Sequence, residues 1–120
     1  MTSTPMLARW FRTMDSDTPD DVLDMITGDF VMSVQFSTGA GGSREFVGDR
    51  ESLIAYLAQR EKSTLVHQVT AGARVGDTEL VLGETRRGGA FEASFNASAQ
   101  VVDHKVRRLL ICRTPELDFS

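Results

Sequence analysis

A single histidine interrupts an apolar alternation in the stretch "TLVHQVTAGARVG", residues 64–76. Read with the period of two typical of a β-strand, the stretch places His67 on one face together with Leu65, Val69, Ala71, Ala73 and Val75. Imidazole titrates near neutral pH, so a histidine that faces a pocket can pass protons to and from a bound molecule. The alternative is that His67 only packs, with its ring satisfied by one hydrogen bond.

Asp15 is the second candidate for acid–base chemistry. It follows an apolar helical face that includes Trp10, Phe11 and Met14. A carboxyl group beside an apolar pocket suits general acid or base work at neutral pH, because desolvation stabilises its protonated form. The alternative is structural: "DSDTPDD" is an acidic turn before a helix, where aspartates are favoured as caps and by the helix dipole.

Glu84, Arg86 and Arg113 are further polar candidates. Glu84 alternates with two leucines along its strand. If that set shares a face with His67, the carboxylate would orient the imidazole and make it more basic; otherwise Glu84 is exposed near a strand end. Arg86 or Arg113 could bind a substrate carboxylate or enolate, because guanidinium recognises such groups bidentately. The alternative for both arginines is an ordinary surface position.

Other kinds of chemistry lack their motifs. The only tyrosine, Tyr56, falls in an expected helix, so strand tyrosines cannot form an oxyanion hole. Two histidines without a close carboxylate cluster argue against a metal site. The sequence contains neither the GxSxG motif of a nucleophilic serine nor the GxxxxGK[ST] loop that binds phosphate groups. Cys112 is the only cysteine, which excludes an internal disulfide. No cofactor is expected.

The composition indicates one globular domain that spans residues 1–120. Hydrophobic residues make up 41% and charged residues 25% of the chain, as in ordinary globular proteins. A net charge of −4 and a pI near 5.1 argue against nucleic acid or an anionic membrane as partner. The N-terminal "MTSTPMLARWF" does not resemble a signal peptide, and no apolar run approaches the ~18 residues of a membrane span. We therefore expect a cytoplasmic protein.

Three helices are expected before most of the strands. Thr4, which precedes a proline, marks the start of the first. Thr18 is expected to cap the second, with Asp21 as its capping-box partner. The third, residues 49–62, has Asp49 as its cap and a narrow apolar stripe.

The expected strands follow the second helix. Residues 29–36 are rich in Val and Phe and predict a strand, which a glycine-rich loop separates from a short strand at residues 45–48. After the third helix the period changes to two. Short turns separate four alternating segments, residues 64–75, 78–87, 90–102 and 105–113, which predict an antiparallel meander. Helices followed by strands indicate the α+β class.

This order of elements resembles the nuclear transport factor 2-like superfamily. The phrase "LARWFRTMDSDTPDDVLDMITGDFVM" is similar to its opening, "EFVGDRESLIAYL" to its glycine-then-helix step, and "LVHQVTAGARVGDTELV" to its long central hairpin. The likeness covers nearly the whole chain and is nearest to the SnoaL-like polyketide cyclases, with scytalone dehydratase and ketosteroid isomerase as more distant members. It implies a cone-shaped α+β barrel in which three N-terminal helices pack on the concave face of a curved, mostly antiparallel sheet.

The resemblance also implies a ligand site between the helices and the sheet. Members of this group usually hold a small apolar molecule there, and many perform acid–base chemistry on it without a cofactor. His67 would then face the pocket, and related dehydratases have a histidine and an acid at positions similar to His67 and Asp15. The expected lining residues are Trp10, Phe11, Phe36, Leu65, Glu84 and Phe95. Small residues are expected to leave room above the sheet: Ala71, Ala73, Ala93, Ala97 and Ala99.

The leading hypothesis is an isomerase, cyclase, dehydratase or hydrolase of a small apolar substrate. His67 would carry the proton and Asp15 would assist as acid or base. The superfamily often dimerises through the convex sheet face, so a homodimer is expected; the polar residues expected on that face are Gln68, Thr70, Arg74, Ser94, Asn96, Ser98 and Gln100. The alternatives are a non-catalytic ligand-binding or dimerisation domain in which His67 is structural, or an accessory subunit of a larger complex.

Overall fold

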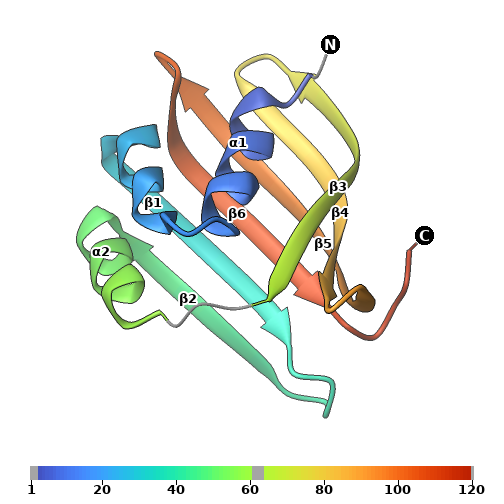
Figure 1. Cartoon of the computed structure of the whole chain (residues 1–120). Coiled ribbons are helices and arrows are strands. Elements are labelled where there is room, and N and C mark those ends of the chain that lie inside the picture. Colours follow the sequence, from blue (N-terminus) through green and yellow to red (C-terminus); the bar gives the residue numbers. More distant parts are fainter. Residues whose placement is uncertain (1–2, 61–63, 120) are drawn as a thin grey trace.

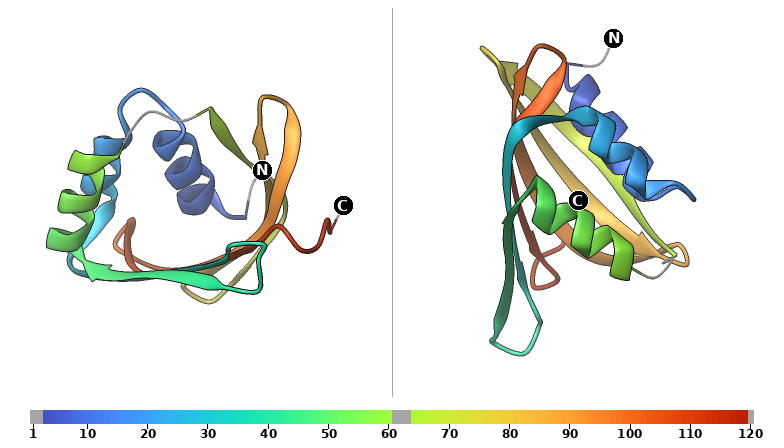
Figure 2. Two further views of the ribbon diagram at one scale, coloured as in Figure 1. Left: turned by 90° about the horizontal axis from the view of Figure 1, so that it is seen from below. Right: turned by 90° about the vertical axis from the view of Figure 1, so that its left-hand side faces the viewer.

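The computed structural model describes residues 3–60 and 64–119 and shows three helices on one face of a single curved sheet (Figures 1 and 2). The helices are α1 (Pro5–Met14), the 3₁₀ helix η1 (Pro19–Met25) and α2 (Arg50–Gln59). The strands are β1 (Ile26–Ser37), β2 (Ser43–Asp49), β3 (Leu65–Val75), β4 (Thr78–Arg87), β5 (Ala90–Val102) and β6 (Lys105–Thr114).

The six strands lie in the order β2-β1-β6-β5-β4-β3, so β2 and β3 are the edges of an unclosed sheet. Neighbouring strands are antiparallel, except β1 and β6, which are parallel. The helices lie across the concave face (Figure 2). The predicted α+β class and the helix-on-concave-sheet arrangement are both confirmed.

Local details depart from the sequence prediction at the second helix. The segment that starts at Pro19 is 3₁₀ rather than α, and the Thr18 side chain makes no capping hydrogen bond. Only the main chain closes that turn, because the Asp21 N–H donates to the Thr18 carbonyl at 3.1 Å. The predicted short strand at residues 45–48 extends over the whole of β2.

The cap predicted for the third helix is confirmed. Asp49 accepts hydrogen bonds from Ser52 N and Oγ, each at 3.1 Å, and these bonds hold the pKa of Asp49 below its usual value. The helix ends at Gln59, and the last two residues predicted for it, Glu61 and Lys62, lie outside the described residues.

The hydrophobic core fills the space between the helices and the concave face. Apolar residues of α1, η1 and α2 that recur at helical spacing point down onto the sheet. The central strands of the sheet contribute their inward-facing side chains, among which aromatic rings alternate with small residues. The most deeply buried members are Leu7, Trp10, Val22, Met25, Ile26, Phe30, Leu53, Ala99 and Val106.

A β-bulge in β3 changes which of its side chains face inward. Val69 pairs with Gly83, but the next pair joins Ala71 to Leu82, so Thr70 is the extra residue. Because a one-residue shift turns every later side chain to the opposite face, Ala71 and Ala73 face the convex side and are exposed. The expectation that these two alanines make room in the pocket is wrong.

The N-terminus of α1 is held by a buried glutamate of the sheet. Glu79 of β4 is fully buried, and its carboxylate accepts hydrogen bonds from Leu7 N at 2.8 Å and Met6 N at 3.1 Å. The Thr4 side chain, by contrast, makes no cap hydrogen bond to the helix. Helix N-termini expose unpaired N–H groups and a partial positive charge, and Glu79 satisfies both from a distant strand.

We expect Glu79→Ala to lower the free energy of unfolding by about 2–3 kcal/mol, because it leaves buried helix N–H groups without an acceptor. Urea denaturation followed by tryptophan fluorescence measures this loss. Glu45→Ala is the matched control, since Glu45 is an exposed glutamate on the edge strand β2, and we expect it to change stability by less than about 0.5 kcal/mol. Equal stabilities of the two variants would contradict the capping role.

Candidate functional site

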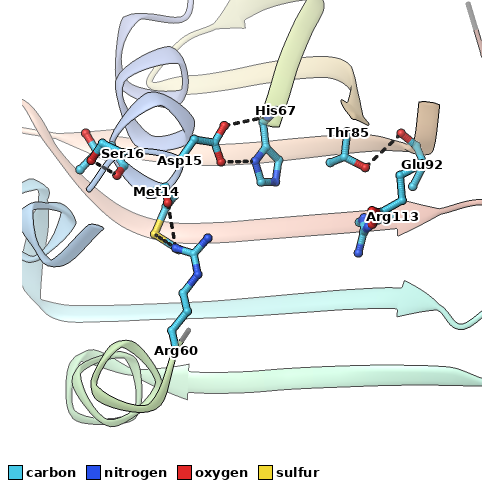
Figure 3. Close-up of polar contacts among 10 residues, drawn as sticks. Met14, Asp15, Ser16, Arg60, His67, Thr85, Glu92 and Arg113 are labelled. Carbon is cyan, nitrogen blue, oxygen red and sulfur yellow. Dashed lines mark hydrogen bonds and ion pairs between the residues drawn. The ribbon is translucent and has the colours of Figure 1, made fainter. Parts of the chain in front are cut away.

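Asp15 and His67 meet where the C-terminus of α1 reaches β3. Asp15 is the residue that ends α1, and His67 is the third residue of β3. The Asp15 carboxylate accepts two hydrogen bonds from the histidine: its Oδ1 lies 2.8 Å from the ring Nδ1, and its Oδ2 lies 2.7 Å from the main-chain N (Figure 3). An ionised carboxylate can only accept, so Nδ1 must carry a proton.

Two aromatic rings fix the position of the imidazole. Phe11 of α1 stacks on His67 with 4.8 Å between ring centroids, and Phe95 of β5 meets the same ring edge-on at 5.4 Å. Side-chain exposure is only 18% for His67 and 12% for Asp15. Nε2 faces away from Asp15 (Figure 3) and has no hydrogen-bond partner among the residues described. A histidine held in this way leaves one nitrogen available to a bound molecule.

The imidazole lines a cavity of about 270 Å³ between the helices and the sheet, which we call the inner cavity. Small-molecule sites usually begin near this size. Four of the predicted lining residues, Trp10, Phe11, Phe36 and Leu65, do line it, whereas Phe95 packs behind His67 and Phe11. Apart from the imidazole, two arginines and one tyrosine, the lining is apolar.

Glu84 does not reach this cavity, so the prediction that it binds substrate beside His67 is wrong. In the register of β3 and β4, His67 lies opposite Thr85, and Glu84 lies opposite Gln68. Successive residues of a strand point to opposite faces, so Glu84 faces the convex side. There its Oε1 accepts a hydrogen bond from Arg86 Nε at 3.0 Å. Alternation in the sequence separates two faces without telling which of them turns inward.

Tyr56 and Arg60, both from the α2 side, are lining residues that were not predicted as site residues. Tyr56 brings a hydroxyl group to the cavity, and its ring packs on Phe46 at 5.4 Å. Arg60 donates from Nη1 to the Met14 carbonyl at 2.9 Å (Figure 3). This bond ties the last turn of α1, which carries Asp15, to the end of α2. The hydrophobic pattern of α2 alone gave no signal for either role.

Arg113, an open alternative in the sequence, lines the inner cavity from β6. Its guanidinium forms an ion pair with Glu92, whose other carboxylate oxygen lies 2.8 Å from Arg87 Nε. Burial, together with the positive charge of Arg87, lowers the pKa of Arg113 from its usual value. Its Nε is buried and has no hydrogen-bond partner among the described residues. Arg86, the other open alternative, does not line this cavity.

Two features are absent from the described part of the chain. Residues 3–60 and 64–119 contain no group of three or more His, Cys, Asp or Glu residues that could hold a metal ion. No helix in the same ranges is both long and apolar enough to cross a membrane.

Solved structures with the same architecture include several bacterial proteins. A proposed polyketide cyclase from Sinorhizobium meliloti superposes with a TM-score of 0.64 at 16% identity, covering 92% of this chain and 99% of that one. IdmH, a proposed polyketide cyclase from Streptomyces antibioticus, superposes with a TM-score of 0.68 at 14% identity, covering 94% of this chain and 92% of that one. A proposed ketosteroid isomerase from Kribbella flavida superposes with a TM-score of 0.68 at 14% identity, covering 98% of this chain and 81% of that one.

These likenesses establish the fold and leave the activity open. No protein-family model matches the sequence, and no curated protein matches it. At identities this low, shared architecture says nothing of shared substrates. The chain has the NTF2-like fold with SnoaL-like and ketosteroid isomerase-like structural neighbours, and in this respect the resemblance drawn from the sequence is confirmed.

We expect Asp15→Asn to move the proton of the neutral His67 ring from Nδ1 to Nε2. The main-chain N–H of His67 needs an oxygen acceptor, so the asparagine amide nitrogen would face Nδ1, which must then accept. Long-range ¹H–¹⁵N NMR at a pH where the ring is neutral distinguishes the two tautomers.

Two controls belong to this measurement. Asp20→Asn, an exposed aspartate of η1, should leave the Nδ1–H form unchanged. His104, exposed in the turn between β5 and β6, is an internal reference that should not respond to either substitution. An unchanged tautomer in Asp15→Asn would show that the carboxylate does not orient the ring.

Proposed function

We propose that this chain is a cofactor-independent enzyme that transfers protons on a small apolar substrate, as an isomerase, cyclase, dehydratase or hydrolase. The observation that carries the proposal is the Nδ1–Oδ1 contact of 2.8 Å between His67 and Asp15, which leaves Nε2 available on the side of an apolar cavity. A carboxylate behind an imidazole orients it and stabilises the imidazolium that forms when the ring takes up a proton.

Nε2 would act as a general base on a carbon next to a carbonyl group. It takes the proton of the C–H bond, and the electrons of that bond move toward the carbonyl oxygen to give an enolate. The imidazolium then returns the proton to another carbon in an isomerisation. In a cyclisation the enolate carbon attacks a second carbonyl group instead, and the oxygen of that group takes the proton from the imidazolium. In a dehydration the imidazolium protonates the β-hydroxyl group, which leaves as water as the C=C bond forms. One proton carrier serves all three outcomes.

The cavity offers two donors that could stabilise the enolate oxygen. Tyr56 of α2 and Arg113 of β6 both line it. Donors that are already in place when charge develops lower the barrier without reorganisation, and they act more strongly where water is excluded. The apolar remainder of the lining would select an apolar substrate.

The non-catalytic alternative is a ligand-binding or dimerisation domain in which His67 is structural, and a ring sealed from solvent and bonded to the main chain would favour it. Here the ring nitrogen Nδ1 contacts a carboxylate, and a cavity adjoins the ring. The contact of the ring with a carboxylate favours a proton-transfer role for His67, whereas the cavity suits an enzyme and a non-catalytic ligand-binding domain alike.

We expect the protein to accelerate the exchange of α-hydrogens of 2-tetralone, a small bicyclic ketone, for deuterium in D₂O. His67→Gln should reduce the acceleration by at least about 100-fold, within the range of a single general base. Asp15→Asn should remove most of it as well, because Nε2 would then carry the proton. ¹H NMR of the ketone follows the exchange directly.

The Asp20→Asn variant and free imidazole at equal concentration are the controls for this assay. Exchange that survives in His67→Gln would contradict the assignment of His67 as the base. Exchange no faster with the wild-type protein than with free imidazole would contradict proton transfer in the inner cavity.

We further propose that the chain forms a homodimer through its convex sheet face. One row of that face crosses all six strands in register and alternates apolar with small side chains: Val47, Ser33, Leu110, Ser98, Leu80 and Ala73. Val47 is 64% and Leu110 49% exposed. A two-fold axis parallel to this row would place apolar residues of one protomer against their equivalents on the other.

We expect Leu110→Lys to shift the mass measured by light scattering from about twice the 13.2 kDa chain mass to a single chain. A buried, unpaired lysine at the centre of an interface is strongly unfavourable. Leu117→Lys is the matched control, because Leu117 is equally apolar and exposed but lies after β6, outside this row. A wild-type protein that is monomeric at micromolar concentration would overturn the proposal.

A further inference from the structure

A second hollow adjoins the inner cavity at the ends of β1 and β6, and we call it the vestibule. Its volume is about 430 Å³, and its lining includes Phe36, Arg44, Glu92 and Arg113. Phe36 and Arg113 also line the inner cavity, so the two hollows share a wall. A molecule that is too long for the inner cavity would therefore extend over Phe36 into the vestibule.

The strand register places two arginines on either side of Phe36. Phe36 of β1 lies directly opposite Arg44 of β2 on one side and Arg113 of β6 on the other. Residues directly opposite one another share a face of the sheet, and Phe36 and Arg113 line the inner cavity on the concave face. The floor of the vestibule is thus an aromatic ring with one guanidinium on each side.

A third arginine strengthens the positive charge at this end of the sheet. Arg87 pairs in register with Leu65, a lining residue of the inner cavity, and it contacts Glu92. Glu92 contacts both Arg87 and Arg113, so two guanidinium groups share one carboxylate. Glu116 accepts a hydrogen bond from Ser37 Oγ at 3.2 Å.

The arginines retain donors that the protein does not use. The Arg44 side chain makes no hydrogen bond or ion pair with any residue in the described ranges, and the buried Nε of Arg113 is likewise without a partner there. Burial and, after it, repulsion by Arg87 lower the pKa of Arg113, and an added negative charge would relieve that repulsion. Guanidinium groups bind carboxylate and phosphate oxygens through paired N–H donors.

We propose that the vestibule binds the anionic group, a carboxylate or a phosphate, of an amphipathic substrate whose apolar part occupies the inner cavity. Arg44 and Arg113 hold the anionic oxygens, and Phe36 supports the segment that joins the two parts. This inference rests on the proposed function, since it takes the inner cavity as the substrate site. It restricts the substrate to molecules with an apolar reacting end and an anionic far end.

Isothermal titration calorimetry with three naphthalene probes tests the vestibule. 1-Naphthaleneacetate carries a carboxylate, 1-naphthyl phosphate carries a phosphate, and 1-naphthaleneacetamide has a similar shape without charge. We expect the wild-type protein to bind at least one anion about tenfold more tightly than the amide. The anion that binds more tightly identifies the class of group.

Substitutions of single arginines show which side chains produce the preference for an anionic probe over the amide. Arg44→Gln and Arg113→Gln should each reduce the preference for the anion to less than about threefold, and Arg44→Gln, which lies outside the lining of the inner cavity, should leave binding of the amide unchanged. Arg108→Gln, which removes the same charge from the convex face, should keep the full preference. Arg44 is exposed, so Arg44→Gln tests the proposal even if Arg113→Gln does not fold.

The outcomes separate this inference from the proposed function. Equal binding of all three probes, or equal losses in Arg44→Gln and Arg108→Gln, would overturn the vestibule and leave the inner cavity as a ligand site. Failure of all three probes to bind would overturn the inner cavity as a ligand site and the vestibule with it. A preference for an anion that is lost in Arg44→Gln and kept in Arg108→Gln supports the proposal.

Discussion

Helix α1 is anchored at both ends by carboxylates, and the geometry of the site depends on these two anchors. At the N-terminus, Glu79 reaches from β4 to the free N–H groups of the helix; at the C-terminus, Asp15 reaches from the helix to both the ring and the main chain of His67. Between them, Leu7, Trp10 and Phe11 bury the apolar face of α1 on the sheet. Apolar packing alone would allow the helix to slide, whereas directional hydrogen bonds at its two ends fix its position.

The two faces of the sheet serve different tasks because alternate residues of each strand belong to different environments. The concave residues pack the core, place His67 beside Phe11 and Phe95, and leave a cavity where the helices do not reach the sheet. The convex residues carry none of this chemistry. A mostly apolar cavity with a few polar groups raises the strength of each polar contact, because little water competes within it.

Much of the fold could be predicted from the sequence, whereas the site could be predicted only in part. The order of elements, the meander and the Asp49 cap follow from local patterns, and His67 and Asp15 were both selected as candidates from the residues around them. The bulge after Val69 could not be foreseen, because the extra residue leaves no mark in the composition of the segment or in its alternation of apolar and polar residues. Glu84 was assigned to the wrong face because alternation separates the two faces of a strand without indicating which of them turns inward. Tyr56 and Arg60 join the site only through the packing of α2 against the sheet, a long-range relation that no local pattern encodes.

The position of β3 at the edge of the sheet gives Asp15 a second consequence. His67 pairs with Thr85 in the register, yet its main-chain N–H points to Asp15 rather than to β4. An edge strand with free N–H groups is a template on which a strand of another molecule can add. The carboxylate at the end of α1 occupies this position of the template, and the bulge interrupts the strand a few residues later. The group that orients the imidazole therefore also blocks strand addition at this position of the edge.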